Sequence, residues 1–288
     1  MVNGYRALLQ SRQEAEDEIQ RENQMRIGFV GLGIQGLPLA LNMVNAGHDL
    51  HGFDVDQKPL AILGDAGGVA AKSVRDLAAE CEVVFICVAT DAQVIDVVAG
   101  DGGLTAHGAP GLIIVNHSTV SAETTTRIAE AARNRNMQLV DAPVSGGAKG
   151  AENKTMSFMI GGDDAALDIC EPLFRLSGST ILRTGPVGSA TLGKLAHQVT
   201  IIGNILAMAE GMRLGVAGGL EPEIVKKIIT GGLARSFIAE TWGEIKMAPH
   251  ALPIYSKDLE NSIRLAETLG IELPGAKLMK QELTRIVP

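Results

Sequence analysis

The sequence of 288 residues predicts an α/β fold in which an N-terminal doubly wound parallel sheet is followed by an all-helical C-terminal domain. Between residues 25 and 187, short continuous apolar segments alternate with helical segments, which is typical of parallel strands covered by helices on both faces. From residue 188 onward, the apolar residues follow helical spacing only. We therefore predict a polar extension over residues 1–24, a sheet domain over 25–187 and a helical domain over 188–288.

The sheet domain begins with a strand, a helix and a second strand. The apolar run Ile27–Val30 ends in glycines, residues 37–46 form an apolar helical stretch that stops at Gly47, and residues 49–53 form the next strand. Together they span about 30 residues, which is the size of one crossover unit of a parallel sheet. The alternation continues, with strands predicted at 83–88, 111–115 and 138–140 and a helix at 122–133.

The helical domain begins with one long apolar stretch over residues 190–216. Glycines at 218–219, 231–232 and 270 separate it from shorter helical segments, because glycine interrupts a helix and often follows its end. These segments are predicted at residues 221–230, 236–246, 257–269 and 276–286.

The composition narrows the class of function. A net charge of −8 leaves no excess of cations for nucleic-acid phosphates, and an aromatic content of 3% leaves few rings for base stacking. No run of about 18 uninterrupted apolar residues predicts a membrane span, and the acidic first 24 residues do not resemble a targeting peptide. Three cysteines without paired spacing predict a reducing compartment and no structural metal. We expect a cytoplasmic protein without a nucleic-acid or membrane partner.

A glycine-rich turn follows the first predicted strand and opens the first predicted helix. In such a Rossmann turn, the first glycine permits a tight turn, the second lets the backbone approach a pyrophosphate, and the third lets helix and strand pack closely. An acidic residue, Asp54, follows about 20 residues later at the end of the second strand, where it would accept the ribose hydroxyls of NAD and repel the phosphate of NADP. Asp56 is the second candidate, and a surface aspartate without function is the structural alternative. The turn consists of Gly31, Leu32, Gly33, Ile34, Gln35 and Gly36.

A second motif follows the last predicted strand of the sheet domain. In the run from Asp141 to Gly147, Ser145 offers a hydroxyl, and Gly146 and Gly147 offer unobstructed backbone N–H groups. Such a group of donors suits a carboxylate, and the carboxyl edge of a parallel sheet is where ligands bind. A plain turn is the alternative interpretation of the same residues.

The third motif is a polar patch on the long apolar helix. Lys194, His197 and Gln198 lie at helical positions i, i+3 and i+4, which share one face. A lysine on a buried helix indicates a function, because uncompensated burial of its charge is costly. The alternative is a lysine that extends to the surface beside a structural histidine.

These motifs, in this order, together with Lys257-Asp258-Leu259, resemble the β-hydroxyacid dehydrogenase family, which includes 3-hydroxyisobutyrate dehydrogenases and tartronate semialdehyde reductases. The resemblance covers residues 25–278. It implies that Lys194 is the general acid/base, that Ser145, Gly146 and Gly147 hold the substrate carboxylate, and that Lys257 lies near nicotinamide and substrate. It also implies homodimers or homotetramers. The remaining cofactor residues that it implies are Val88, Ala89, Thr90, Ser118 and Thr119.

The chain departs from the family where an asparagine is usual and His197 stands instead. A histidine there is similar to the 6-phosphogluconate dehydrogenases, in which it contacts the substrate. We predict hydride transfer between NAD and a small 3-hydroxy acid, with His197 and Gln198 orienting the substrate. A 6-phosphogluconate-type enzyme is disfavoured because no arginine and lysine cluster for a sugar phosphate is evident. A catalytically silent NAD-binding module is disfavoured because Lys194 is present.

Overall fold

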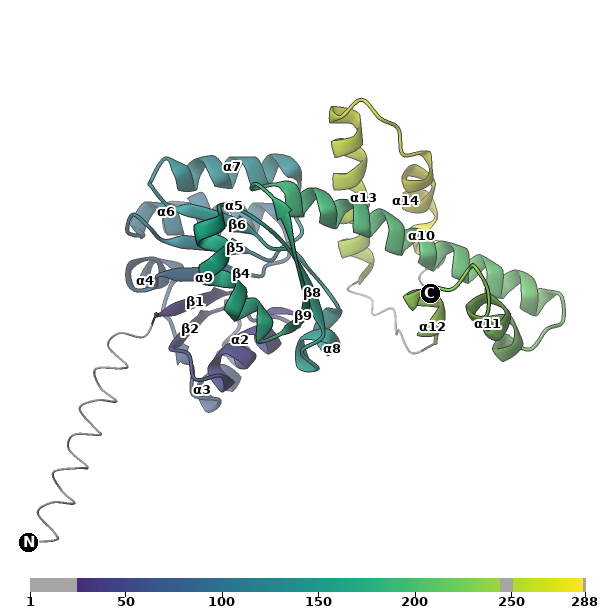
Figure 1. Cartoon of the computed structure of the whole chain (residues 1–288), viewed down its shortest axis with the longest axis horizontal. Coiled ribbons are helices and arrows are strands. Elements are labelled where there is room, and N and C mark those ends of the chain that lie inside the picture. Colours follow the sequence, from purple (N-terminus) through teal and green to yellow (C-terminus); the bar gives the residue numbers. More distant parts are fainter. Residues whose placement is uncertain (1–24, 244–250, 287–288) are drawn as a thin grey trace, which may run out of the picture. The chain divides into compact units, whose positions relative to one another are not determined.

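The computed structural model describes residues 25–243 and 251–286, which form two compact units (Figure 1). The sheet unit comprises the described residues up to 118 and residues 126–190. The helical unit comprises residues 119–125 and the described residues from 191 on. The predicted polar extension, residues 1–24, lies outside the described residues.

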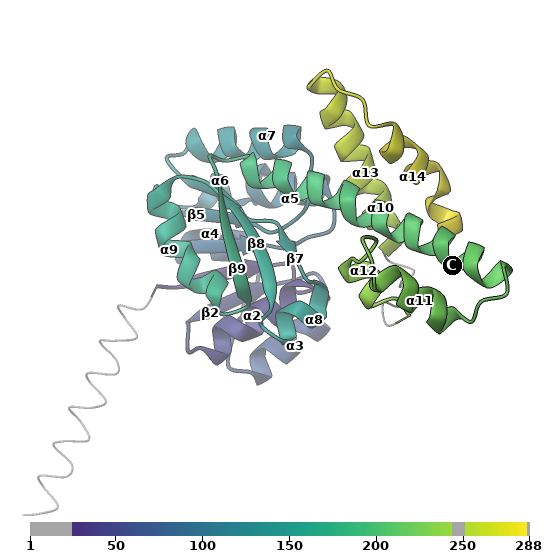
Figure 2. The same cartoon turned by 45° about the vertical axis from the view of Figure 1, so that its right-hand side comes forward.

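The sheet unit contains one nine-stranded sheet in the order β3-β2-β1-β4-β5-β6-β8-β7, with β9 paired to β8 (Figures 1 and 2). Strands β1 to β6 are parallel, as the continuous apolar runs predicted. The strand order reverses at β1, which lies between β2 and β4, and such a switch point is where open α/β sheets bind ligands. The strands are β1 (Ile27–Val30), β2 (Leu50–Phe53), β3 (Val69–Ala70), β4 (Val83–Ile86), β5 (Ile113–Asn116), β6 (Gln138–Asp141), β7 (Val144–Ser145), β8 (Met156–Gly161) and β9 (Gly178–Gly185).

The sequence patterns did not predict β3 or the strands that follow β6. Strand β8 pairs antiparallel with β6 and β7 and parallel with β9, so the sheet is mixed at this end. Its sequence, Met-Ser-Phe-Met-Ile-Gly, contains only two residue types with high strand propensity, Phe and Ile. It is nevertheless mostly buried, because the tertiary contacts with its neighbours decide its conformation.

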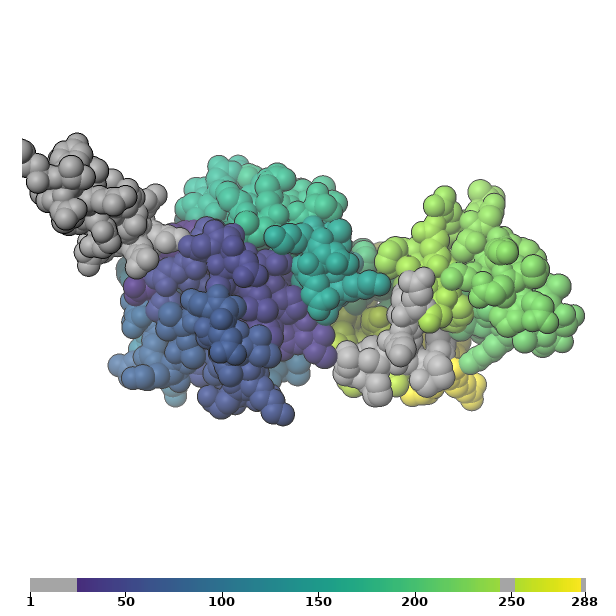
Figure 3. Space-filling model, turned by 90° about the horizontal axis from the view of Figure 1, so that it is seen from below, coloured from purple at the N-terminus to yellow at the C-terminus, as the bar shows by residue number. Residues whose placement is uncertain are grey.

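Helices α2, α3, α8 and α9 contribute to one apolar cluster with β1, β4 and β5. Asn42 of α2 is buried and donates hydrogen bonds to the Ala151 carbonyl of α8 and to Ser177 Oγ, both at 2.9 Å. In the space-filling view, the purple segment that contains α2 adjoins the teal segment that contains α8 (Figure 3). The helices are α2 (Gly36–Asn45), α3 (Gln57–Asp65), α4 (Val74–Glu80), α5 (Asp91–Ala99), α6 (Leu104–His107), α7 (Ala122–Arg133), α8 (Gly147–Glu152) and α9 (Asp164–Arg175).

A histidine, His117, is buried at the centre of this core. Its ring lies among four phenylalanine rings, with centroids between 5.4 and 6.4 Å away, and its Nδ1 lies 2.6 Å from the Ala142 carbonyl oxygen. Burial lowers the pKa of His117 to about 4, although the carbonyl opposes this shift. The folded protein therefore holds His117 neutral. The four rings are those of Phe29, Phe85, Phe158 and Phe174.

We expect the free energy of unfolding to decrease as the pH falls from about 6.5 to about 4. In this range, His117 binds a proton in the unfolded chain but stays neutral in the folded protein. The depressed pKa corresponds to a loss of about 3 kcal/mol across this range, and stability above pH 6.5 is unaffected. Urea unfolding of the wild type and of His117→Phe at pH 7.5 and pH 5 measures this. The variant should have the smaller difference between the two pH values, and an equal difference would contradict the assignment.

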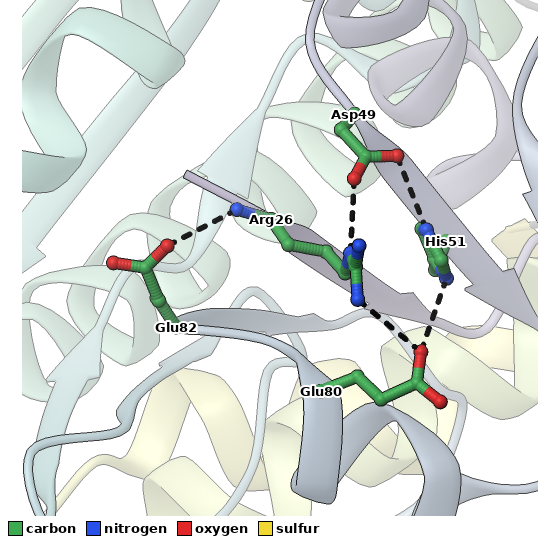
Figure 4. Close-up of polar contacts among 5 residues, drawn as sticks. All are labelled: Arg26, Asp49, His51, Glu80 and Glu82. Carbon is green, nitrogen blue, oxygen red and sulfur yellow. Dashed lines mark hydrogen bonds and ion pairs between the residues drawn. The ribbon is translucent and has the colours of Figure 1, made fainter. Parts of the chain in front are cut away.

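A polar network joins the beginnings of three neighbouring strands (Figure 4). Arg26, before β1, pairs with Asp49, before β2, at 2.9 Å and with Glu80 of α4 at 3.5 Å, while its backbone N–H donates to Glu82 at 3.3 Å. His51 contacts Asp49 at 3.1 Å. These side chains are partly exposed, so each pair contributes little to stability. They lie at the amino ends of the strands, whereas ligands bind at the carboxyl ends.

The helical unit has its own apolar core, formed by α10 and α12 to α14. Helix α13 begins at Ala251, before the predicted start at residue 257. Pro253 does not prevent this earlier start, because it lies in the first turn, where a missing N–H costs no helical hydrogen bond. The helix predicted at 236–246 is shorter within the described residues, and positions 244–246 lie outside them. The helices are α10 (Ser189–Ala217), α11 (Pro222–Thr230), α12 (Phe237–Glu240), α13 (Ala251–Thr268) and α14 (Pro274–Ile286).

One helix among the described residues, α10, is long and apolar enough to cross a membrane by length and composition alone. Only 22% of its most apolar window is buried within the chain. The core helix of a protein that never enters a membrane passes the same test, so this feature is weak evidence of a membrane span.

Candidate active site

The turn between β1 and α2 is built around glycines. Gly31 has a φ of +91°, and a Cβ at this position would lie 2.3 Å from the Cys87 carbonyl oxygen. A Cβ on Gly36 would lie 2.0 Å from the Gly31 carbonyl oxygen. A Cβ on Gly33, in contrast, would meet nothing within 4 Å. The turn is therefore closed at its two ends, and its middle leaves the backbone open to a ligand at the N-terminus of α2, where phosphate binding is favourable.

The carboxylate of Asp54 lies directly beside this turn. It accepts a hydrogen bond from the Leu32 N–H at 2.6 Å and another from the Asp56 N–H at 2.8 Å. Asp56, the second candidate from the sequence, instead caps α3 by accepting from the Lys58 N–H at 3.0 Å. Asp54 is therefore held in place at the end of β2, whereas the carboxylate of Asp56 is engaged in starting the next helix.

The loops after β4 and β5 are connected to each other. Ser118, which is buried after β5, accepts a hydrogen bond through Oγ from the Val88 N–H at 2.9 Å. Exposed Ala89 follows Val88, and Thr90 caps α5 in a reciprocal arrangement with Gln93. Because β2, β1, β4 and β5 are neighbours, these loops lie at the same edge of the sheet as the glycine turn.

The second motif lies after β6 of the same sheet. Asp141 is fully buried and accepts a hydrogen bond from the Gly188 N–H at 2.9 Å, so its carboxylate serves to position the chain that leads into α10. Ser145 ends β7 and is half-buried. Gly146 and Gly147 have φ values of +135° and +62°, and a Cβ on Gly147 would meet nothing within 4 Å. A Cβ on Gly146 would instead lie 2.8 Å from Met156 Sδ, so the left-handed turn is packed at Gly146 and open at Gly147.

Lys194 of α10 is buried in the helical unit, with 6% of its surface exposed. Its pKa is lowered to about 8, mainly by burial; the charge of Asp258 opposes this shift, and the charge of Lys257 adds a smaller lowering. The alternative interpretation, in which Lys194 extends to the surface, is therefore wrong. A lysine with this pKa exists in both protonation states near neutral pH, as a group that gives and takes protons must.

Two side chains near Lys194 connect α10 to α13. Gln198 is buried, and its Nε2 donates to Asp258 Oδ2 at 2.5 Å. His197 is half-buried, and its Nδ1 lies 3.2 Å from Gln198 Oε1. Burial lowers the pKa of His197, and the charge of Lys194 lowers it further.

Lys257 of α13 is fixed at two points. Its Nζ donates to the carbonyl of Thr119 and lies 3.1 Å from Asp258 Oδ1. Asp258 Oδ1 meets Lys257 as an ion pair and makes no hydrogen bond. In the described part of the chain, Asn261 Nδ2 is the other buried side-chain atom without a hydrogen-bond partner.

The structure thus brings Lys194, His197, Gln198 and Lys257 together within the helical unit. One residue of this cluster, Asp258, was not among the predicted site residues. It lies on α13, but no local pattern shows that this face of the helix packs against α10. The other predicted site residues, apart from Thr119, belong to the sheet unit.

Comparison with known families gives two matches that together cover almost all of the chain. Residues 26–185 match the NAD-binding domain of 6-phosphogluconate dehydrogenase, and residues 188–287 match the NAD-binding region of NADP-dependent 3-hydroxyisobutyrate dehydrogenase. The 2-hydroxy-3-oxopropionate reductase of Escherichia coli (strain K12) is 34% identical over 256 residues, which are 87% of each chain. The chain belongs to the β-hydroxyacid dehydrogenase family.

Other members of the β-hydroxyacid dehydrogenase family are similar to it as well. The NAD-dependent L-serine dehydrogenase of Pseudomonas aeruginosa is 38% identical over 204 residues, covering 71% of this chain and 68% of that protein. A structure of the Mycobacterium tuberculosis 3-hydroxyisobutyrate dehydrogenase with L-serine superimposes with a TM-score of 0.80 and 25% identity, covering 91% of this chain and 93% of that one. The sheet unit is therefore a Rossmann domain, and the chain is an NAD-linked hydroxyacid oxidoreductase, as predicted.

The sheet unit fits the NAD that this family uses. The open backbone at Gly33, the N-terminus of α2 and the fixed carboxylate of Asp54 are the three features that a dinucleotide requires at the switch point of the sheet. No side chain caps α2. The Leu37 N–H donates to the Gly33 carbonyl at 3.0 Å and Pro38 has no N–H, so α2 offers a phosphate the positive end of its dipole beside the backbone of the glycine turn.

Proposed function

We propose that the enzyme interconverts a small 3-hydroxy acid, of the 3-hydroxyisobutyrate or tartronate semialdehyde type, and the corresponding 3-oxo acid, with Lys194 as general acid/base. The observation that carries this proposal is the buried lysine whose pKa is lowered to about 8. In oxidation, neutral Lys194 accepts the hydroxyl proton while the carbinol carbon gives up its hydrogen as hydride. In reduction, charged Lys194 returns the proton to the carbonyl oxygen.

The remaining residues bind and orient in this proposal. Ser145 and the N–H groups of Gly146 and Gly147 hold the substrate carboxylate, because they are donors in a left-handed turn that is open at Gly147. His197 and Gln198 orient the reacting oxygen from the helix face that carries Lys194. Lys257 adds to the lowering of the Lys194 pKa that burial mainly causes, and it lies near nicotinamide and substrate.

For the cofactor, we propose that the turn from Gly31 to Gly36 and Asp54 hold the pyrophosphate and the adenosine ribose of NAD. Val88, Ala89, Thr90, Ser118, Thr119 and Lys257 line the rest of the dinucleotide, as the resemblance to the family implies. When bound, NAD supplies or accepts the hydride at its nicotinamide ring.

The pH dependence of kcat/KM should have opposite signs in the two directions. Oxidation requires neutral Lys194, so its kcat/KM should rise with pH and level off above about pH 8. Reduction requires the charged form, so its kcat/KM should fall above about pH 8. Burial and the charge of Lys194 both lower the pKa of His197, so protonation of His197 should change kcat/KM only at more acidic pH. Steady-state assays from pH 5 to pH 10 measure both profiles, and profiles of the same sign would contradict the role of Lys194.

The second candidate, a 6-phosphogluconate-type enzyme, is not favoured. Its family profile matches only the Rossmann part, whereas the helical part matches 3-hydroxyisobutyrate dehydrogenase. NADH absorbance with a panel of 3-hydroxy acids and 6-phosphogluconate separates the candidates. Turnover of a 3-hydroxy acid supports the proposal, turnover of 6-phosphogluconate alone supports the rival, and NADH binding without any turnover supports a silent module.

We further propose that the enzyme is a cytoplasmic homodimer or homotetramer that binds neither nucleic acid nor membrane. Apolar side chains of the helical unit are left exposed in a single chain, among them Leu214 at 78%, Ile228 at 62% and Phe237 at 72%. Light scattering on purified enzyme should give a multiple of 30.2 kDa without detergent. Leu214→Glu should shift the mass towards that of one chain, whereas a monomeric wild type would contradict the proposal.

A further inference from the structure

Helix α2 carries two polar side chains, one toward each end, that reach α8 or the strand beside it. Gln35 precedes the helix in the glycine turn, and Asn42 lies in its last turns. They are seven positions apart, which is about two helical turns, so they share one face of α2. This face meets α8, which lies beside α2 in both ribbon views (Figures 1 and 2).

The contact at Asn42 is a pair of buried hydrogen bonds. Its Nδ2 donates to the Ala151 carbonyl of α8 and to Ser177 Oγ, both at 2.9 Å, and all three residues are buried. The Ala151 carbonyl also accepts from the Lys154 N–H at 3.2 Å, so the end of α8 is closed by the chain itself. Asn42 therefore adds something else, which is a fixed distance between α8 and α2.

The contact at Gln35 runs through the sulfur of Met156, the first residue of β8. Met156 is fully buried, and Gln35 Nε2 lies 3.9 Å from its Sδ. A Cβ on Gly146 would lie 2.8 Å from this sulfur and a Cβ on Gly150 2.9 Å, so the two glycines leave the space that the thioether fills. The first turn of α8 therefore rests on Met156, which also contacts the dinucleotide turn.

These two contacts determine where the turn from Ser145 to Gly147 lies. Helix α8 begins at Gly147 and has only six residues, so a shift of the helix moves the turn with it. Asn42 holds the end of α8, and Met156 supports its start. Because α2 itself begins at the glycine turn, the turn for the dinucleotide and the turn before α8 belong to one packed body.

We propose that Asn42 and Met156 are positioning residues for the hydroxy acid, which hold the turn from Ser145 to Gly147 at the distance from the dinucleotide turn that the substrate carboxylate requires. This inference rests on the proposed function, because it takes that turn as the carboxylate site. A carboxylate is bound alike in the ground state and the transition state, so a displaced turn should raise KM more than it lowers kcat.

Kinetics of two matched variants test the role of Asn42. Asn42→Ala should raise KM for a 3-hydroxy acid by about tenfold or more and keep kcat within about threefold of the wild type, with NADH binding nearly unchanged. Ser177→Ala removes one buried hydrogen bond of the same amide but leaves the bond to Ala151, so its KM should stay near the wild-type value. An equal rise of KM in both variants would show that the amide acts through general stability, and would overturn the proposal.

Gly150→Ala tests the other contact and does not depend on the folding of Asn42→Ala. It leaves the side-chain hydrogen bonds of Asn42 in place but puts a Cβ against Met156 Sδ, which should displace the start of α8. We expect KM to rise by about tenfold here too, while NADH binding is kept. An unchanged KM would show that the position of α8 does not set substrate binding, and would overturn the proposal.

A substrate without the charge separates a lost carboxylate contact from a general disturbance of the site. The wild type should prefer a 3-hydroxy acid over its primary amide in kcat/KM, and Asn42→Ala should reduce this preference by about the factor by which its KM rises. An equal loss on the acid and the amide would overturn the inference and leave the proposed function intact.

Hydrogen exchange of the NADH-bound enzyme tests the inference without any substrate. The backbone amides of residues 146–151 should exchange about tenfold or more faster in Asn42→Ala than in the wild type, and at the wild-type rate in Ser177→Ala. Unchanged exchange in folded Asn42→Ala would overturn the inference, whatever the substrate. Exchange as predicted, in a wild type that turns over no 3-hydroxy acid, would instead contradict the proposed function.

Discussion

Replacing Lys194 with alanine is expected to lower kcat by about 10²-fold or more in both directions, because the variant lacks the group that moves the hydroxyl proton. Binding of NADH should be nearly unchanged, since Lys194 belongs to the helical unit and the glycine turn to the Rossmann unit. Steady-state kinetics give kcat, and fluorescence titration with NADH gives the dissociation constant.

Lys227→Ala is the matched control for this variant. Lys227 is an exposed lysine of α11 in the same helical unit, outside the cluster around Lys194, so its removal should leave kcat unchanged. If Lys194→Ala retained most of the wild-type kcat, the buried lysine would have a structural role only, and the acid/base assignment would be wrong.

The second large effect concerns the choice between NAD and NADP. We expect a preference for NAD of about 10²-fold or more in kcat/KM, because the fixed carboxylate of Asp54 would lie against the extra phosphate of NADP. Val55 follows it, so no adjacent arginine compensates the charge. Kinetics with each cofactor at varied concentration measure the preference, and equal use of the two would contradict the role of Asp54.

Two substitutions at Asp54 separate charge from structure. Asp54→Asn removes the charge but keeps an oxygen that can accept the Leu32 N–H, so the preference should weaken while turnover with NAD continues. Asp54→Ala also loses the bond that holds the glycine turn, so KM should rise for both cofactors. If Asp54→Asn left the preference at its wild-type value, another residue would have to discriminate between the cofactors.

The parts of the fold that sequence reasoning predicted are those with strong local patterns. The parallel strands from β1 to β6 are continuous apolar runs, and the glycines around α2 mark its beginning, so each element is evident within a few residues. Strands β7 to β9 lack such patterns. Strand β7 contains two residues, and most of β9 is exposed, so that pairing across the sheet rather than local preference makes them strands.

The candidate site divides in the same way. Lys194, His197 and Gln198 lie on one helix, where spacing alone predicts that they share a face. Asp258, which lies sixty positions after Gln198, could not be placed beside it from the sequence, because the packing of α13 against α10 is a tertiary contact. The lowered pKa of Lys194 could not be predicted either, because it also depends on tertiary packing. Burial and the charge of Lys257 lower it, and neither is a property of the neighbouring sequence.

The most direct measurement of the central claim follows the transferred hydrogen itself. A 3-hydroxy acid with deuterium on its carbinol carbon is incubated with enzyme and NAD, and mass spectrometry determines where the deuterium goes. We predict one deuterium on the nicotinamide ring for each molecule oxidised by the wild type, and about 10²-fold slower transfer in Lys194→Ala despite normal NADH binding. Transfer at equal rates in the two proteins, or no transfer from any 3-hydroxy acid by an enzyme that binds NADH, would contradict the account.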